Sequence, residues 1–99
     1  MLLNDGVYLG TPVETIEYGE TIVTYLYQEV PAISKSIRQK EWYESRLLGL
    51  KPELMFEMRA SEYYGETRLK YLEKEYEIVR TFEKDGLIEL ICSSISNGT

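Results

Sequence analysis

The stretch from Ser34 to Glu53 is the only part of this 99-residue chain in which polar and apolar residues follow a helical period. The segments on both sides of it carry the alternation and the β-branched residues that are typical of strands. A lone helix among strands constrains the fold, because the strands must accommodate it as an insertion. We therefore expect a mainly β protein with one short α-helix inserted between two strands.

The helix is expected to cover residues 36–48. Ser36 and Gln39 have the spacing of a capping box, in which two side chains satisfy backbone donors at the start of a helix. Gly49 and Pro52 predict its end, since glycine accepts the left-handed conformation and proline cannot continue a helix. A helix of about three turns is marginal in water, so it should dock on something and be less rigid than the strands.

The remaining pattern predicts about six strands with hairpin-length connections. They are expected at residues 7–9, 21–33, 54–60, 67–71, 76–82 and 88–92. Residues 10–12, Gly-Thr-Pro, should end the first strand, and Asp85-Gly86 should form a hairpin turn. This succession favours a small antiparallel β-barrel over an open sheet with two exposed edges. Residues 1–92 would form one domain and residues 93–99 a flexible tail.

Two strands carry predictions about which way their side chains point. In the third strand, Phe56 and Met58 should face inward together with Leu54 and Ala60, and Met55 should face outward with Glu57 and Arg59. In the long second strand, Ile22, Leu26 and Val30 share one face, whereas Val23, Tyr25 and Tyr27 share the other. Neither face is cleanly polar, so the second face either packs under a loop or the inserted helix or meets a partner. Pro31 should weaken or end strand pairing.

Composition excludes several classes of function. The chain has no histidine, and Cys92 is its only cysteine, so a disulfide within the chain and the commonest general base are both excluded. The formal net charge of −6 argues against a protein that reads nucleic-acid sequence. Neither a signal peptide nor a membrane span is recognisable, so we expect a cytosolic protein that does not enter a membrane.

Candidate sites for chemistry are weak. Glu73, Glu75 and Glu77 alternate along one segment, which suits either a solvated strand face or the acids of a hydrolase. No phosphate-binding glycine loop and no acidic calcium loop is present, and no cofactor is expected. Lys35, Arg38 and Lys40 form a small basic group that is either solvated or meets a phosphate or an acidic neighbour.

Aromatic residues point to contact with a partner. The chain has nine tyrosines and one tryptophan, more than a domain of this size can bury, and both residue types are common in interfaces. Tyr71 and Tyr76 are assigned to the core. The candidate interface consists of Tyr25, Tyr27, Lys35, Arg38, Trp42, Tyr43, Tyr63 and Tyr64.

The order of several short motifs resembles the head-tail joining proteins of tailed phages, which are also called head-closure or stopper proteins. The matching pieces are Lys35-Ser36, Glu41-Trp42-Tyr43, Gly49 to Glu53, Tyr64-Gly65-Glu66, Tyr76 to Thr81 and Glu89-Leu90. The match as a whole runs in order from about Gly19 to Cys92. Two departures concern Leu72-Glu73-Lys74, where family members often have Asn-Gly, and Pro31-Ala32 at the end of the long strand. The departures leave the hairpin type and the end of that strand open.

The resemblance implies a non-enzymatic virion protein with a small barrel. Such proteins form a ring, usually of twelve subunits, below the portal and its adaptor, where the ring retains DNA in the head and receives the tail. It implies assembly in the host cytoplasm and DNA that passes without sequence-specific binding. We expect the free chain to be mainly monomeric, because the helix is marginal and the sequence shows no cleanly apolar, self-complementary patch. Two alternatives remain: a monomeric β-barrel module that binds a protein or peptide, and an acid-dependent hydrolase.

Overall fold

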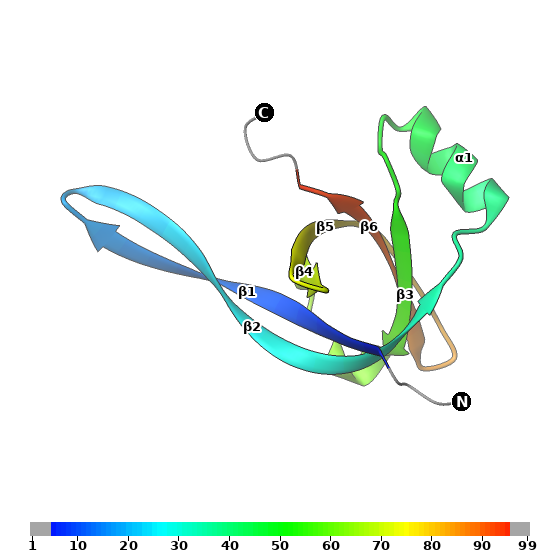
Figure 1. The fold of residues 1–99 in the computed structure, drawn as a ribbon, viewed down its shortest axis with the longest axis horizontal. Helices are drawn as coiled ribbons and strands as arrows, with labels where there is room; N and C mark the ends of the chain where they lie inside the picture. Colours follow the sequence, from blue (N-terminus) through cyan, green and yellow to red (C-terminus); the bar gives the residue numbers. More distant parts are fainter. Residues whose placement is uncertain (1–4, 96–99) are drawn as a thin grey trace.

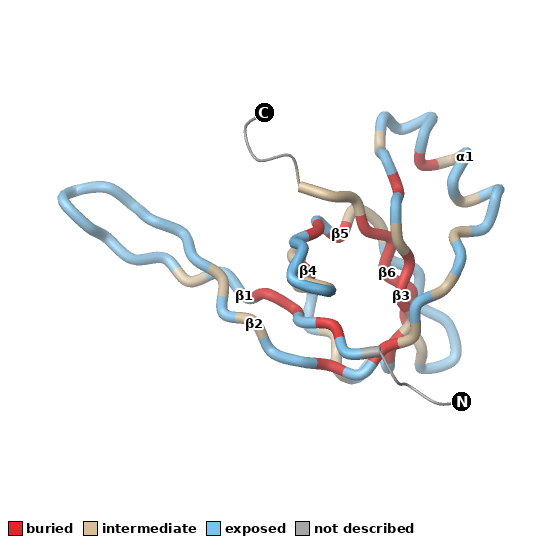
Figure 2. The backbone as a smooth tube through the Cα atoms, viewed as in Figure 1, coloured by how far each residue is buried: buried red, intermediate tan, exposed pale blue. Residues whose placement is uncertain are grey.

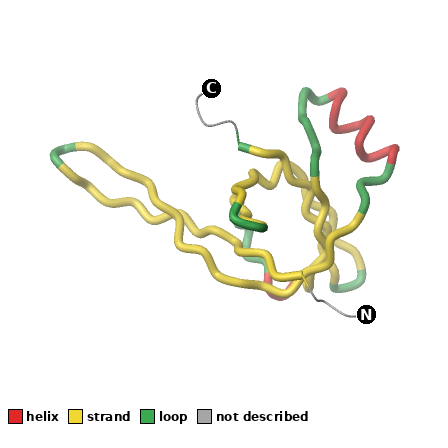
Figure 3. Tube along the Cα trace, in the orientation of Figure 1, coloured by secondary structure: helices red, strands yellow, loops and turns green. Residues whose placement is uncertain are grey.

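Within residues 5–95, which the computed structural model describes, six antiparallel strands form one ring-like sheet (Figures 1 and 3). The elements are β1 (Asp5–Glu17), β2 (Glu20–Lys35), α1 (Gln39–Leu47), β3 (Leu54–Arg59), the 3-10 turn η1 (Ala60–Glu62), β4 (Arg68–Tyr71), β5 (Lys74–Lys84) and β6 (Leu87–Ser94). The order around the ring is β1-β2-β3-β6-β5-β4, and β4 pairs with β1 to close it. The predicted mainly β fold of about six strands with one inserted helix is confirmed.

The core fills the interior of this ring. Its buried members come from all six strands: Val7, Leu9, Val30, Ala32, Phe56, Met58, Leu69, Tyr76, Ile78, Ile88, Leu90 and Cys92. The ring of Phe56 meets that of Tyr71 edge-on, with 4.8 Å between centroids. Burial raises the pKa of the Cys92 thiol to about 12, which is the behaviour of a small core residue rather than a reactive thiol.

The first strand is longer than predicted, because β1 continues through Gly10 and Pro12 to Glu17. Beyond Gly10 the only partner of β1 is β2, so one edge of β1 is open and a residue without an N–H is tolerated there. At Gly10 a Cβ atom would lie 2.8 Å from a ring carbon of Tyr27. Glycine therefore permits a close approach here, and the prediction that these residues end the strand was wrong.

The extra length of β1 and β2 forms a projecting hairpin, here named the arm (residues 11–26). The arm extends far from the barrel in Figure 1, and Figure 2 shows that burial is concentrated in the barrel and not in the arm. The overall extents of the molecule are 46 × 30 × 22 Å. Pro31 does not end β2, which pairs with β1 as far as Ala32 and with β3 from Ile33.

Three hairpins use two-residue turns with positive φ at both positions. Tyr18-Gly19 closes the arm, Leu72-Glu73 joins β4 to β5, and Asp85-Gly86 joins β5 to β6. The predicted Asp-Gly turn is confirmed. Leu72-Glu73 adopts the same conformation, with φ values of 50° and 64°, although neither residue is favoured there.

The inserted helix begins at Gln39, three residues later than predicted, with Arg38 as its N-cap and no side-chain capping bond. The Ser36 capping box is therefore wrong. Its end is as predicted: the N–H of Gly49 donates to the carbonyl of Arg46, and the N–H of Leu50 donates to that of Ser45. This is a Schellman motif, with Gly49 at a φ of 79°.

The last strand, β6, reaches Ser94, beyond the predicted start of the tail at residue 93. Residues 96–99 of the predicted tail lie outside the described residues.

Met55 is buried, although the alternation predicted an outward position for it. Its register partner is Ile91, which is also buried and, like Met55, is not part of the interior core. These two residues thus form a small second layer on the outer face of β3 and β6. The helix α1 is the element available to cover this face, with the side that carries the buried Ser45.

The turn between β4 and β5 provides a test of backbone strain. Replacing Leu72 with Asn and Glu73 with Gly should raise the free energy of unfolding by about 1 kcal/mol, because both new residues tolerate positive φ. Urea unfolding of the double variant measures this. Glu83→Gly, at an exposed β5 position, is the control and should lower stability by about 0.5–1 kcal/mol. A lower midpoint for L72N/E73G would contradict the turn assignment.

Candidate functional site

The helix α1 has its polar side toward the barrel and its apolar side toward solvent. Ser45 is fully buried. Glu41 on the same side forms an ion pair with Arg80 of β5, with 3.1 Å between carboxylate oxygen and guanidinium nitrogen. Tyr43 and Leu47 on the opposite side are 59% and 70% exposed, and Trp42, on the flank between the two sides, is 47% exposed. A helix that packs on its own protein normally buries its apolar stripe. This reversed arrangement leaves large apolar side chains available to a partner.

We name Lys40, Trp42, Tyr43, Arg46 and Leu47 the α1 aromatic face. Gln39, Lys40, Trp42 and Tyr43 line a shallow hollow of about 400 Å³ on it. The guanidinium carbon of Arg46 lies 5.7 Å from the centroid of the Trp42 ring, within the range of a cation–π contact. The face therefore combines broad apolar surface with cations, a composition common at the centre of protein interfaces.

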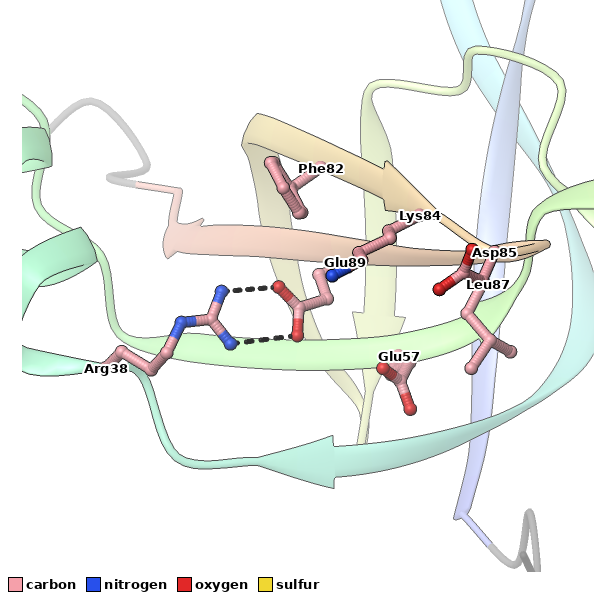
Figure 4. Close-up of a pocket in the computed structure, with 7 residues that line it drawn as sticks. All are labelled: Arg38, Glu57, Phe82, Lys84, Asp85, Leu87 and Glu89. Atoms are coloured by element: carbon pink, nitrogen blue, oxygen red, sulfur yellow. Dashed lines mark hydrogen bonds and ion pairs between the residues drawn. The ribbon is translucent and has the colours of Figure 1, made fainter.

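An ion-pair network fixes the segment that leads into α1. Glu89 is buried on the outer face of β6, and both of its carboxylate oxygens accept hydrogen bonds from Arg38, at 2.6 and 3.1 Å (Figure 4). Lys35 lies 3.3 Å from both Glu89 and Glu57. The bonds from Arg38 and then Lys35 lower the pKa of Glu89, against the opposing effect of burial. The network positions the start of α1 without a capping side chain.

The partners of these cations, Glu57 and Glu89, were not predicted as site residues. Glu89 interrupts the apolar run of β6, and this single acid among apolar neighbours was the available signal. A hollow of about 500 Å³ lies beside them, lined by Arg38, Glu57, Phe82, Lys84, Asp85, Leu87 and Glu89 (Figure 4). Its two buried or half-buried carboxylates already face cations, so the geometry is that of a structural network.

Tyr25 and Tyr27 lie at the base of the arm and contact other residues of the chain. Arg68 of β4 lies over the Tyr25 ring at 4.7 Å, and Lys70 lies over the Tyr27 ring at 5.8 Å. The hydroxyl of Tyr27 donates to Glu75 at 2.9 Å. Burial and this bond raise the pKa of Tyr27 to about 12. These tyrosines fasten the arm to β4 and β5, which is the internal alternative left open by the sequence.

Tyr63 and Tyr64 lie together in the loop after η1. The ring of Tyr63 packs against the core, and its hydroxyl donates to the carbonyl of Glu66 at 2.6 Å. The side chain of Tyr64 is exposed, while its backbone N–H donates to the Glu66 carboxylate. Of the eight predicted interface residues, the structure thus places Lys35 and Arg38 in the ion-pair network before α1, Trp42 and Tyr43 on α1, and the two tyrosine pairs elsewhere.

The arm was not predicted as a projecting hairpin, although Tyr25 within it was a candidate interface residue. Its exposed apolar residues are Ile16, Tyr18, Ile22, Val23 and Leu26. Directly paired residues point to the same side, so the side that continues the core face carries Val13, Ile22 and Leu26 with threonines between them. The signal in the sequence was a β-branched run without a single lysine or arginine before residue 35. Because residues 10–12 were predicted to end the first strand, a long projecting hairpin was not expected.

The three acids considered for hydrolysis occupy ordinary positions. Glu73 lies in a turn, Glu75 accepts the bond from Tyr27, and Glu77 lies opposite Arg68. Among the described residues there is no group of three or more acidic or cysteine side chains placed to hold a metal ion. In the same part of the chain, no helix is long and apolar enough to cross a membrane.

No protein-family model matches this chain, and no curated protein matches it.

The Glu89 network makes a pH-dependent contribution to stability. Because the pKa of Glu89 in the folded chain lies below its ordinary value of 4.5, its contribution is present above that pH and is lost as the pH falls through the lower folded value. Glu89→Gln should lower the free energy of unfolding at pH 7 by about 1–2 kcal/mol, since the paired cations are partly exposed. Urea unfolding at pH 7 and about pH 3 measures both effects.

Glu14→Gln, which makes the same change of charge on the exposed arm, is the control and should leave stability nearly unchanged. The difference between wild type and E89Q should shrink at the acid pH. A difference that is equal at both pH values would contradict the assigned role of the Glu89 carboxylate.

Proposed function

We propose that this chain is a structural component of the head-tail connector of a tailed phage or prophage. Copies of it, twelve in number if the resemblance holds, would form a ring below the portal and adaptor that closes the DNA-filled head and receives the tail. The observation that carries the proposal is the orientation of α1. Ion pairs between side chains hold the helix on the barrel, and Trp42 and Tyr43 are exposed on it. The resemblance in Lys35-Ser36 and Glu41-Trp42-Tyr43 falls on this same element.

Further support comes from the fold and the charge. A small barrel is the architecture that the resemblance implies, and the described residues form one. The net charge of −6 suits a channel through which DNA passes, since an acidic protein repels the phosphate backbone. In this proposal the virion is the site of function, and the host cytoplasm is the site of assembly.

The proposal predicts that truncating the α1 aromatic face blocks assembly and leaves the barrel folded. Trp42→Ala with Tyr43→Ser should weaken binding to portal–adaptor assemblies at least about tenfold, because exposed aromatic anchors dominate interface energies. Thermal unfolding should change little, since both side chains are largely exposed. Negative-stain microscopy for added ring density, together with a pull-down, measures the binding.

Leu72→Ser is the matched control, because Leu72 is 80% exposed and lies in the turn between β4 and β5, outside α1 and the ion-pair network that holds it. We expect it to retain most of the binding. Absence of added ring density with the wild-type chain would contradict the connector function and favour a monomeric protein- or peptide-binding module. Full binding by the α1 variant would contradict the role of α1.

A further inference from the structure

We propose that the α1 aromatic face is the docking site for the arm of a second copy of this chain. This inference deepens the proposed function by naming the subunit contact of the ring, and it rests on that function only for the closure of the ring. Two independent features of the described residues carry it: complementary charge and unpartnered apolar surface on both sides.

The arm is acidic and its tip is electrostatically unfavourable in the isolated chain. Residues 11–26 include three acidic residues, Glu14, Glu17 and Glu20, and no lysine or arginine. Glu17 and Glu20 are directly opposite each other at the end of the arm, and like charges in that position destabilise a strand pair. Neither carboxylate contacts a cation among the described residues. A cation supplied by another molecule would relieve this repulsion.

The α1 aromatic face supplies such cations. Lys40 has no acidic partner in the described part of the chain. The guanidinium of Arg46 likewise has no acidic partner there and lies over the ring of Trp42. Lys51 and Lys84 are also without an acidic contact in this part of the chain, but neither lies on α1 beside the exposed aromatic side chains. Lys40 and Arg46 therefore form the cationic surface that best complements the arm.

Apolar surface matches on the two sides. Behind its acidic tip, the arm exposes Tyr18, Ile22 and Leu26, and a two-stranded hairpin that packs on nothing is marginal in water. The α1 aromatic face offers Trp42, Tyr43 and Leu47 and the hollow of about 400 Å³. Docking would bury both sets while placing carboxylates beside cations.

Geometry requires that the two surfaces belong to different copies. The arm and α1 project from opposite ends of the molecule in Figure 1, so the arm tip of one chain lies away from its own helix. A contact between unlike surfaces of identical chains is head-to-tail, and it forms a ring when the rotation between copies closes. The contact is therefore of the type that a ring needs.

The test uses complementary charge reversals in the purified chain, without phage components. One variant carries Glu17→Lys and Glu20→Lys, and the other carries Lys40→Glu and Arg46→Glu. Each alone places like charges on the arm and the helix, whereas their mixture pairs a basic arm with an acidic helix. Sedimentation and titration of ¹⁵N-labelled chain at millimolar concentration measure the association.

We expect the mixture to associate at least about tenfold more tightly than either variant alone, with amide shifts at the arm tip and α1. Glu73→Lys with Glu83→Lys, which reverses two exposed acids outside the arm, should associate as wild type does. A mixture that associates no better than its components, or a wild-type chain without concentration-dependent shifts, would overturn the inference. A connector that assembles on the portal through other faces would remain possible in either case.

Discussion

The short closure of the barrel between β1 and β4 determines the rest of the structure. Among the described residues, only Tyr8, Leu9 and Gly10 of β1 pair with β4, whereas β1 pairs with β2 along its whole length. Because β4 is four residues long, most of the β1–β2 hairpin has no third strand beside it and must project as the arm. Gly10 lies at the branch point, where only a residue without a side chain admits the Tyr27 ring. The arm is thus a consequence of unequal strand lengths.

The helix follows a related principle, because it is attached through charge and not through its apolar side chains. Arg38 bonds to the buried Glu89 at the start of α1, and Glu41 bonds to Arg80 along it. Ion pairs that are partly exposed stabilise only modestly, but they specify position. Trp42 and Tyr43 are consequently free of the barrel. Both projections therefore expose apolar surface that the chain does not bury by itself.

The sequence predicted the parts of the fold that depend on local chemistry. Alternation in β3, the Asp85-Gly86 turn and the Gly49 helix end each follow from one or a few neighbouring residues. The start of α1 was mispredicted because Arg38 is held by Glu89, 51 positions away in the chain, and that contact outweighs the local cap at Ser36. Met55 was mispredicted because burial on the outer face depends on what covers the barrel. Trp42 and Tyr43 were proposed as interface residues from their residue type, and the structure shows them exposed on α1, whereas the projection of the arm depends on strand lengths that the local sequence did not reveal.

The central claim is that the arm and the α1 aromatic face are exposed in the free chain and buried between subunits in the assembly. Hydrogen exchange of the same chain, free and bound to portal–adaptor assemblies, tests it most directly. In the free chain, amides of residues 11–26 should exchange faster than those of the core strands, since they belong to an unsupported hairpin. On assembly, the account predicts that protection increases chiefly at residues 11–26 and 39–47. Protection that increases only on other strands, with these two segments unchanged, would contradict it.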